Sequence, residues 1–130
     1  MAHLILVDDA SALAELFAEA ITRHLGHTVT VAVSLAGVEE ALAQSPLVDL
    51  AIVDLSFPQE RGSGIDALAE IHRAHPSARL AVITQGDEWV AQVLRDAWEL
   101  LPIATVISKS APLSYQLNAI ERTIAEGSAP

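Results

Sequence analysis

Short apolar runs alternate with longer amphipathic stretches along the whole chain. The runs are rich in aliphatic and β-branched residues and are too short for helices, which is typical of buried strands. They predict five strands, over residues 4–7, 28–33, 50–53, 79–83 and 105–107. Strands that are apolar throughout need cover on both faces, so the pattern favours a parallel sheet between layers of helices.

The stretches between the strands carry apolar residues at helical spacing. We expect Ser11 and Ser34 to cap the first two helices and Gly26 to end the first. A fourth helix is expected from about Asp87, with Trp98 on its core-facing side. The apolar face of the first helix is predicted from the spacing of Leu13, Leu16, Phe17, Ala20, Ile21 and Leu25.

The order of elements is strand then helix, repeated five times. Right-handed crossovers between parallel strands leave few topologies, and a doubly wound five-stranded α/β sheet with five helices is the natural one. Ligands of such sheets bind in a crevice at the carboxyl ends of the strands. The chemistry is therefore expected at that edge.

Length and composition narrow the class of protein. The 130 residues suit one domain, which we place at residues 1–126, with 127–130 as a tail or the start of a linker. No apolar run approaches the roughly 20 residues that cross a bilayer, and no basic segment precedes the first run. The sequence has no cysteine, which excludes disulfides and thiolate metal sites. We expect a soluble, cytoplasmic protein without a membrane partner.

The charge of the chain is strongly acidic. Seventeen acidic residues against seven basic ones give a formal net charge of −10. Such a surface repels phosphate backbones, so direct nucleic acid binding by this chain is not expected. It favours cations and basic partners, although plain solubility explains the charge equally well.

Polar residues follow the predicted strands at the edge where a ligand is expected. Asp8 and Asp9 come after the first strand, Asp54 after the third and Thr84 after the fourth, and Lys109 lies just past the fifth. The carboxyl ends of parallel strands share one edge, so we expect these side chains to converge. Each residue alone has an ordinary explanation, such as a helix cap, a turn or a surface lysine. These separate explanations do not account for the convergence of all five residues at one edge.

The predicted cluster suits phosphoryl chemistry with a divalent cation. Three carboxylates close together repel one another unless they are protonated or a cation neutralises them. Oxygen ligands without histidine or cysteine favour Mg²⁺. An aspartate beside a metal ion and Lys109 can attack a phosphoryl donor, and Thr84 can donate a hydrogen bond to a phosphoryl oxygen. The histidines show no metal-binding spacing and are expected at the surface or at strand edges: His3, His24, His27, His72 and His75.

These motifs together resemble the receiver domains of two-component response regulators, over nearly the whole chain. The resemblance implies a flavodoxin-like sheet of order 2-1-3-4-5. It also implies that a sensor histidine kinase transfers a phosphoryl group to Asp54. By the same resemblance Mg²⁺ is bound by Asp54, by Asp9 directly, by Asp8 largely through water and by the backbone carbonyl of Ser56. Thr84 and Lys109 then hold the phosphoryl group.

The segment 108–112, Ser-Lys-Ser-Ala-Pro, is similar to NarL/FixJ-type regulators, in which a helix-turn-helix output domain follows the receiver. This likeness implies a role in transcription regulation if such a domain follows Pro130. It also implies a possible homodimer through the fourth helix, the fifth strand and the last helix. Self-catalysed phosphorylation and hydrolysis make such a protein an enzyme only in a loose sense.

Several positions depart from the receiver pattern, among them the segment 98–102 before the fifth strand. Val106 replaces the usual switch aromatic of the fifth strand, and Gln85 replaces a small residue after Thr84. They keep open the alternative of a phosphorylation-independent dimerisation or docking module. A metal-dependent phosphohydrolase is a third possibility. It usually needs a second carboxylate two residues after the nucleophile, where this chain has Ser56.

Overall fold

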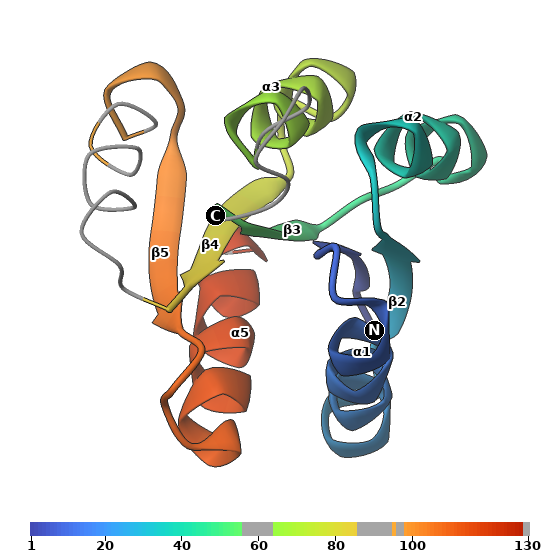
Figure 1. The fold of residues 1–130 in the computed structure, drawn as a ribbon. Helices are drawn as coiled ribbons and strands as arrows, with labels where there is room; N and C mark the ends of the chain where they lie inside the picture. The colour runs from blue at the N-terminus through green and yellow to red at the C-terminus, as the bar shows by residue number, and fades with distance from the viewer. Residues whose placement is uncertain (56–63, 86–94, 96–97, 129–130) are drawn as a thin grey trace.

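The apolar runs form one parallel sheet in the computed structural model (Figure 1), with strand order β2-β1-β3-β4-β5. The structure describes residues 1–55, 64–85, 95 and 98–128. The predicted sheet and its order are confirmed. The strands are β1 (His3–Val7), β2 (Thr28–Ala32), β3 (Leu50–Asp54), β4 (Arg79–Thr84) and β5 (Ile103–Ser108).

Helices cover both faces of the sheet, as Figure 1 shows: α1 and α5 on one side, α2 and α3 on the other. Residues 98–100 are also helical, while the start predicted for the fourth helix lies outside the described residues. No described helix is long and apolar enough to cross a membrane. The helix bounds are α1 (Ser11–Leu25), α2 (Leu35–Gln44), α3 (Gly64–Ala74) and α5 (Leu113–Ser128).

Alternate strand residues build two separate apolar layers. Ile5 and Val53 belong to the layer under α2 and α3, whereas Leu6 and Ile52 belong to the layer under α1 and α5. All four side chains are at most 1% exposed. Successive side chains of a strand point to opposite faces, so a run that is apolar at every position fills both layers. This packing fixes the strand ends in space.

The ends of the first two helices follow local chemistry, with one correction. Gly26 ends α1 at φ 75°, in the left-handed conformation that glycine adopts most easily. Ser34 caps α2, since its hydroxyl accepts a hydrogen bond from the Gly37 N–H at 3.0 Å. The predicted Ser11 cap is wrong, because Ser11 is already helical and the cap position is held by Ala10 without a side-chain hydrogen bond.

Three predictions of burial are also corrected. Leu13 and Leu16 are 63% and 64% exposed, because α1 turns its smaller residues Ala14 and Ala18 toward the sheet. Trp98, expected on the core-facing side of its helix, is 51% exposed. His27, expected at the surface or at a strand edge, directly precedes the edge strand β2 but is buried at 8% exposure, and its Nδ1 accepts a hydrogen bond from the Ala2 N–H.

Candidate active site

Four strands deliver the predicted residues to one edge of the sheet. Asp54 and Thr84 are the last residues of β3 and β4, and they are 1% and 7% exposed. Asp8 follows β1 directly and is 5% exposed, while Asp9 is exposed to solvent. Lys109 follows β5. The convergence expected from the sequence therefore holds in the structure.

Lys109 is ion-paired with two of the carboxylates. Its Nζ lies 2.7 Å from Oδ2 of Asp54 and 3.0 Å from Oδ2 of Asp8. Burial by itself lowers the pKa of Lys109, but hydrogen bonds and charge attraction from Asp54 and Asp8 outweigh it, so the pKa lies above its ordinary value. The amine is therefore a fixed positive charge at neutral pH.

Backbone hydrogen bonds hold the loops that carry these side chains. The N–H of Lys109 donates to the carbonyl of Thr84 at 2.9 Å, which fixes the end of β5 against β4. The N–H of Asp8 donates to the carbonyl of Ala32 at 3.1 Å. Oδ1 of Asp8 accepts from the Ala10 N–H at 2.9 Å. Asp8 thus orders the turn before α1 and pairs with Lys109, but it does not cap the helix, because no side chain among the described residues bonds the N–H groups of the first turn.

The start of α3 lies against the backbone of Asp54. A Cβ on Gly64 would be 2.8 Å from the Asp54 carbonyl oxygen and 2.9 Å from the Cα of Leu55. Real side chains do not approach that closely, so only glycine fits here. Gly64, the first residue of α3, therefore packs directly against the end of β3, while residues 56–63 lie outside the described part of the chain.

Three carboxylates offer a place for a cation. Oxygen atoms of Asp8, Asp9 and Asp54 all lie within 4.8 Å of one another. Hard oxygen donors at this spacing fit Mg²⁺, which takes one or two carboxylates and keeps several waters. Ser56, expected to add its backbone carbonyl, lies outside the described residues.

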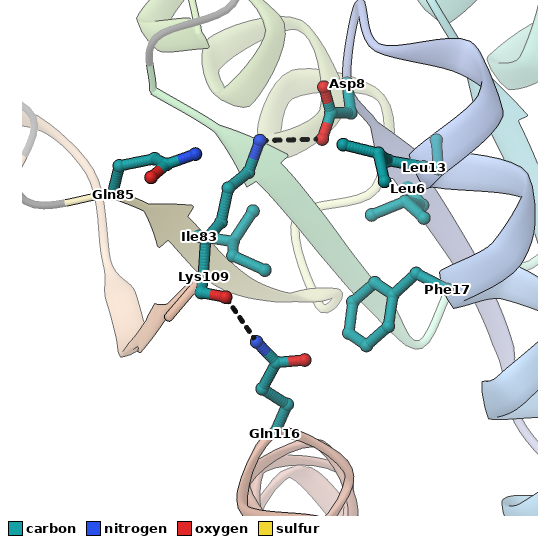
Figure 2. A pocket seen from close by; sticks show the side chains of 9 residues that line it. Leu6, Asp8, Leu13, Phe17, Ile83, Gln85, Lys109 and Gln116 are labelled. Atoms are coloured by element: carbon teal, nitrogen blue, oxygen red, sulfur yellow. Dashed lines mark hydrogen bonds and ion pairs between the residues drawn. The ribbon is translucent and has the colours of Figure 1, made fainter. Parts of the chain in front are cut away.

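A cavity of about 230 Å³ opens beside Lys109, between α1 and α5 (Figure 2). Its walls are apolar on the side of Leu13 and Phe17 and polar where Gln85 and Lys109 lie. Gln116 of α5 also lines it, at 8% exposure, and donates to the backbone of the loop after β5. Sequence reasoning missed Gln116. The available signal was a polar residue beside Leu117, within the apolar pattern of the last helix.

Val106 and Gln85, which depart from the receiver pattern, differ in burial and in position. Val106 is partly buried and packs against the core layer under α2 and α3. Gln85 is exposed, and its side chain extends over the cavity toward Lys109 (Figure 2). Gln85 therefore lies where it can contact a group bound next to Lys109.

The family model of the response regulator receiver domain matches residues 4–112. The chain belongs to this family. The match covers β1 from Leu4 onward, the other four strands, and every acidic, threonine and lysine position of the site. The predicted family is therefore confirmed, while the closer likeness to NarL/FixJ-type regulators stays a prediction. A search of curated proteins found no match.

Solved receiver structures share the fold at low identity. A CheY-like receiver domain protein from Methanospirillum hungatei JF-1 is 19% identical with a TM-score of 0.79, covering 98% of this chain and 96% of that one. A LuxR-family two-component response regulator from Aurantimonas sp. SI85-9A1 is 24% identical with a TM-score of 0.78, covering 97% and 86%. NtrX from Brucella abortus is 21% identical with a TM-score of 0.81, but the match is 97% of this chain and only 27% of NtrX.

Proposed function

We propose that this receiver domain accepts a phosphoryl group on Asp54 from a sensor histidine kinase in the cytoplasm, with Mg²⁺ bound beside it. The observation that carries the proposal is the contact of Lys109 Nζ with both Asp54, at 2.7 Å, and Asp8, at 3.0 Å. An ion pair that only stabilises the fold needs one carboxylate. Here one ammonium group contacts two carboxylates, and oxygen atoms of these two and of a third carboxylate lie within 4.8 Å of one another. This arrangement suits a site that binds a further charged group.

Asp54 is the nucleophile of the proposed reaction. One of its carboxylate oxygens forms a bond to phosphorus, while the bond from phosphorus to the imidazole nitrogen of a phosphohistidine breaks. The nitrogen keeps the electron pair and takes up a proton. The product is an aspartyl phosphate, whose extra charge biases the surface near Thr84 and β5.

Positioning and charge neutralisation carry most of the catalysis of such a transfer. Lys109 supplies a fixed positive charge for a phosphoryl oxygen, and the Thr84 hydroxyl supplies a hydrogen bond. Asp8, Asp9 and Asp54, with the backbone carbonyl of Ser56, would hold Mg²⁺. The ion neutralises phosphoryl charge when it is bound.

The phosphorylation-independent docking module is less well supported. The departures at Val106 and Gln85 bear on the response that follows phosphorylation. The chain has all of the acidic residues, the threonine and the lysine that the transfer itself requires. We therefore retain phosphoryl acceptance as the function. A homodimer through the fourth helix, β5 and α5, or an output domain after Pro130, belongs to the same proposal as the route of the response.

Incubation with acetyl phosphate tests the proposal. We expect intact-protein mass spectrometry to show the mass of one added phosphoryl group when Mg²⁺ is present and none when EDTA replaces it. Asp54→Asn should abolish the gain, while Asp66→Asn, an acidic residue on α3, should leave it unchanged. A gain that persists in Asp54→Asn, or no gain in the unaltered protein, overturns the proposal.

A further inference from the structure

Gln116 is a buried polar residue on the apolar side of α5. It lies in the first turn of the helix, where its backbone N–H donates to the Pro112 carbonyl at 3.1 Å. Its side chain is part of the cavity wall beside Lys109, between apolar neighbours such as Phe17 and Ile83 (Figure 2). Burying an amide costs free energy unless it is hydrogen-bonded, so its contacts are informative.

The amide of Gln116 donates to two successive backbone carbonyls at the end of β5. Nε2 lies 2.9 Å from the Ser108 carbonyl oxygen and 3.3 Å from that of Lys109. Among the described strands, β5 is at the edge of the sheet and pairs with β4. The helix thereby supplies hydrogen bonds at the end of an edge strand.

Lys109 is held on both sides of its Cα. Its N–H donates to the Thr84 carbonyl of β4 at 2.9 Å, and its carbonyl accepts from Gln116 of α5. The next turn is tightened locally, because the Ala111 N–H donates to the Ser108 carbonyl at 3.2 Å. With the main chain held, the Cα of Lys109 stays at the distance from which its ammonium group reaches both carboxylates.

We infer that Gln116 is a positioning residue for Lys109: it holds the main chain so that the ammonium group stays between Asp54 and Asp8. This inference rests on the proposed phosphoryl transfer for its effect on rate. Removing the amide leaves the lysine present and charged but free to take other directions. Small displacements of a charged group that stabilises a transition state lower rates steeply.

Two variants remove the donor in different ways. Gln116→Leu keeps the volume of the side chain and removes the hydrogen bonds, while Gln116→Glu keeps the shape and places oxygen against the carbonyls. Thr123→Val is the matched control. Thr123 is buried in the same helix at 3% exposure, but its hydroxyl donates to Ala119 of α5 itself, at 2.7 Å.

The first readout is the rate of phosphorylation by acetyl phosphate at saturating Mg²⁺. Both Gln116 variants should slow the transfer about tenfold, while Thr123→Val keeps the original rate. The affinity for Mg²⁺, measured by calorimetry, should not weaken in either Gln116 variant, because the Gln116 amide donates to backbone carbonyls and not to the proposed metal ligands. A role in fold stability alone would lower both quantities, or affect Thr123→Val equally, and would overturn the inference.

The second readout does not need phosphoryl transfer. Lys109 is the only lysine in the sequence, so an amine-acetylating reagent labels one side chain, which peptide mass spectrometry separates from the N-terminal amine. Loss of the Gln116 contacts should make Nζ react severalfold faster, and Thr123→Val should not. Unchanged reactivity in both Gln116 variants overturns the inference. If the unaltered protein accepts no phosphoryl group, the proposed function fails and this comparison alone decides the role of Gln116.

Discussion

Lys109 contacts both Asp54 and Asp8 with its ammonium group. Its side chain is 18% exposed, and those of Asp8 and Asp54 are 8% and 2% exposed. Charges that are this poorly hydrated need a partner, since an unpaired buried charge is costly. Lys109 therefore stabilises the fold in addition to its proposed chemical role.

Lys109→Met should lower the free energy of unfolding by about 2–4 kcal/mol in EDTA, because it removes the positive charge that lies against two buried carboxylates. Mg²⁺ should restore part of the loss by neutralising the same carboxylates. Urea denaturation with and without Mg²⁺ measures both effects. The isolated substitution Arg73→Met, at an exposed pair with Glu70, is the control and should change little. Equal stability of Lys109→Met and the unaltered protein in EDTA would show that the pair is not needed.

The pKa of Lys109 sets the pH range of this contribution. Folding raises the pKa above the ordinary value of 10.5, so the stabilisation is fully present below 10.5 and is lost as pH rises through the folded-state pKa. The difference in unfolding free energy between the unaltered protein and Lys109→Met should be constant from neutral pH to about 10.5 and shrink above it. A difference that shrinks already between pH 8 and 10, measured by denaturation at each pH, would contradict the assignment.

At the level of elements, the start of α3 is the tightest contact with the site. Gly64→Ala places a methyl group 2.8 Å from the Asp54 carbonyl oxygen and should cost about 1–3 kcal/mol of stability. Gly37→Ala is the comparison in α2, since a Cβ there would be 3.3 Å from the Ser34 hydroxyl and at least 3.6 Å from the other neighbours. It should cost less than Gly64→Ala, because the gain of up to about 1 kcal/mol in helix propensity offsets the contact with the capping hydroxyl. Thermal denaturation compares the two, and equal effects would count against the close contact.

Element prediction from the sequence succeeded where a single local rule decides the outcome. Apolar runs became strands, Gly26 ended α1 and Ser34 capped α2. It failed where packing decides. Leu13 and Leu16 have the right spacing for burial, but the close approach of α1 to the sheet selects alanines for that face instead. Helical spacing identifies the residues that share one face of a helix, but it does not show which of them contact the core.

The site was predictable for a related reason. Asp8, Asp54, Thr84 and Lys109 follow strands directly, so a parallel sheet alone brings them to one edge. Gln116 reaches the site from a helix, through hydrogen bonds to the backbone carbonyls of the loop after β5. Ser34 also binds backbone and was predicted, because a helix cap bonds a neighbour a fixed number of residues away, whereas the partners of Gln116 are set by the packing of α5 against β5.

For the whole molecule, the net charge of −10 and the carboxylate cluster predict that Mg²⁺ stabilises the fold. Binding to the folded state alone adds about 2.7 kcal/mol when the ion is at 100 times its dissociation constant. We expect the melting temperature to rise with Mg²⁺ at constant ionic strength. Asp9→Asn should reduce the rise, and Glu15→Gln, on the exposed side of α1, should not. An equal rise with matched NaCl would point to general screening instead.

The central claim, that Asp54 accepts the phosphoryl group, is tested most directly by identifying the modified residue. An acyl phosphate is reduced by borohydride to an alcohol, so treatment after incubation with acetyl phosphate and Mg²⁺ should convert residue 54 from aspartate to homoserine. Peptide mass spectrometry should find that change at Asp54 alone and find none when Mg²⁺ is omitted. Reduction at another carboxylate, or an unreduced Asp54 in a protein that carries the phosphoryl group, would contradict the account.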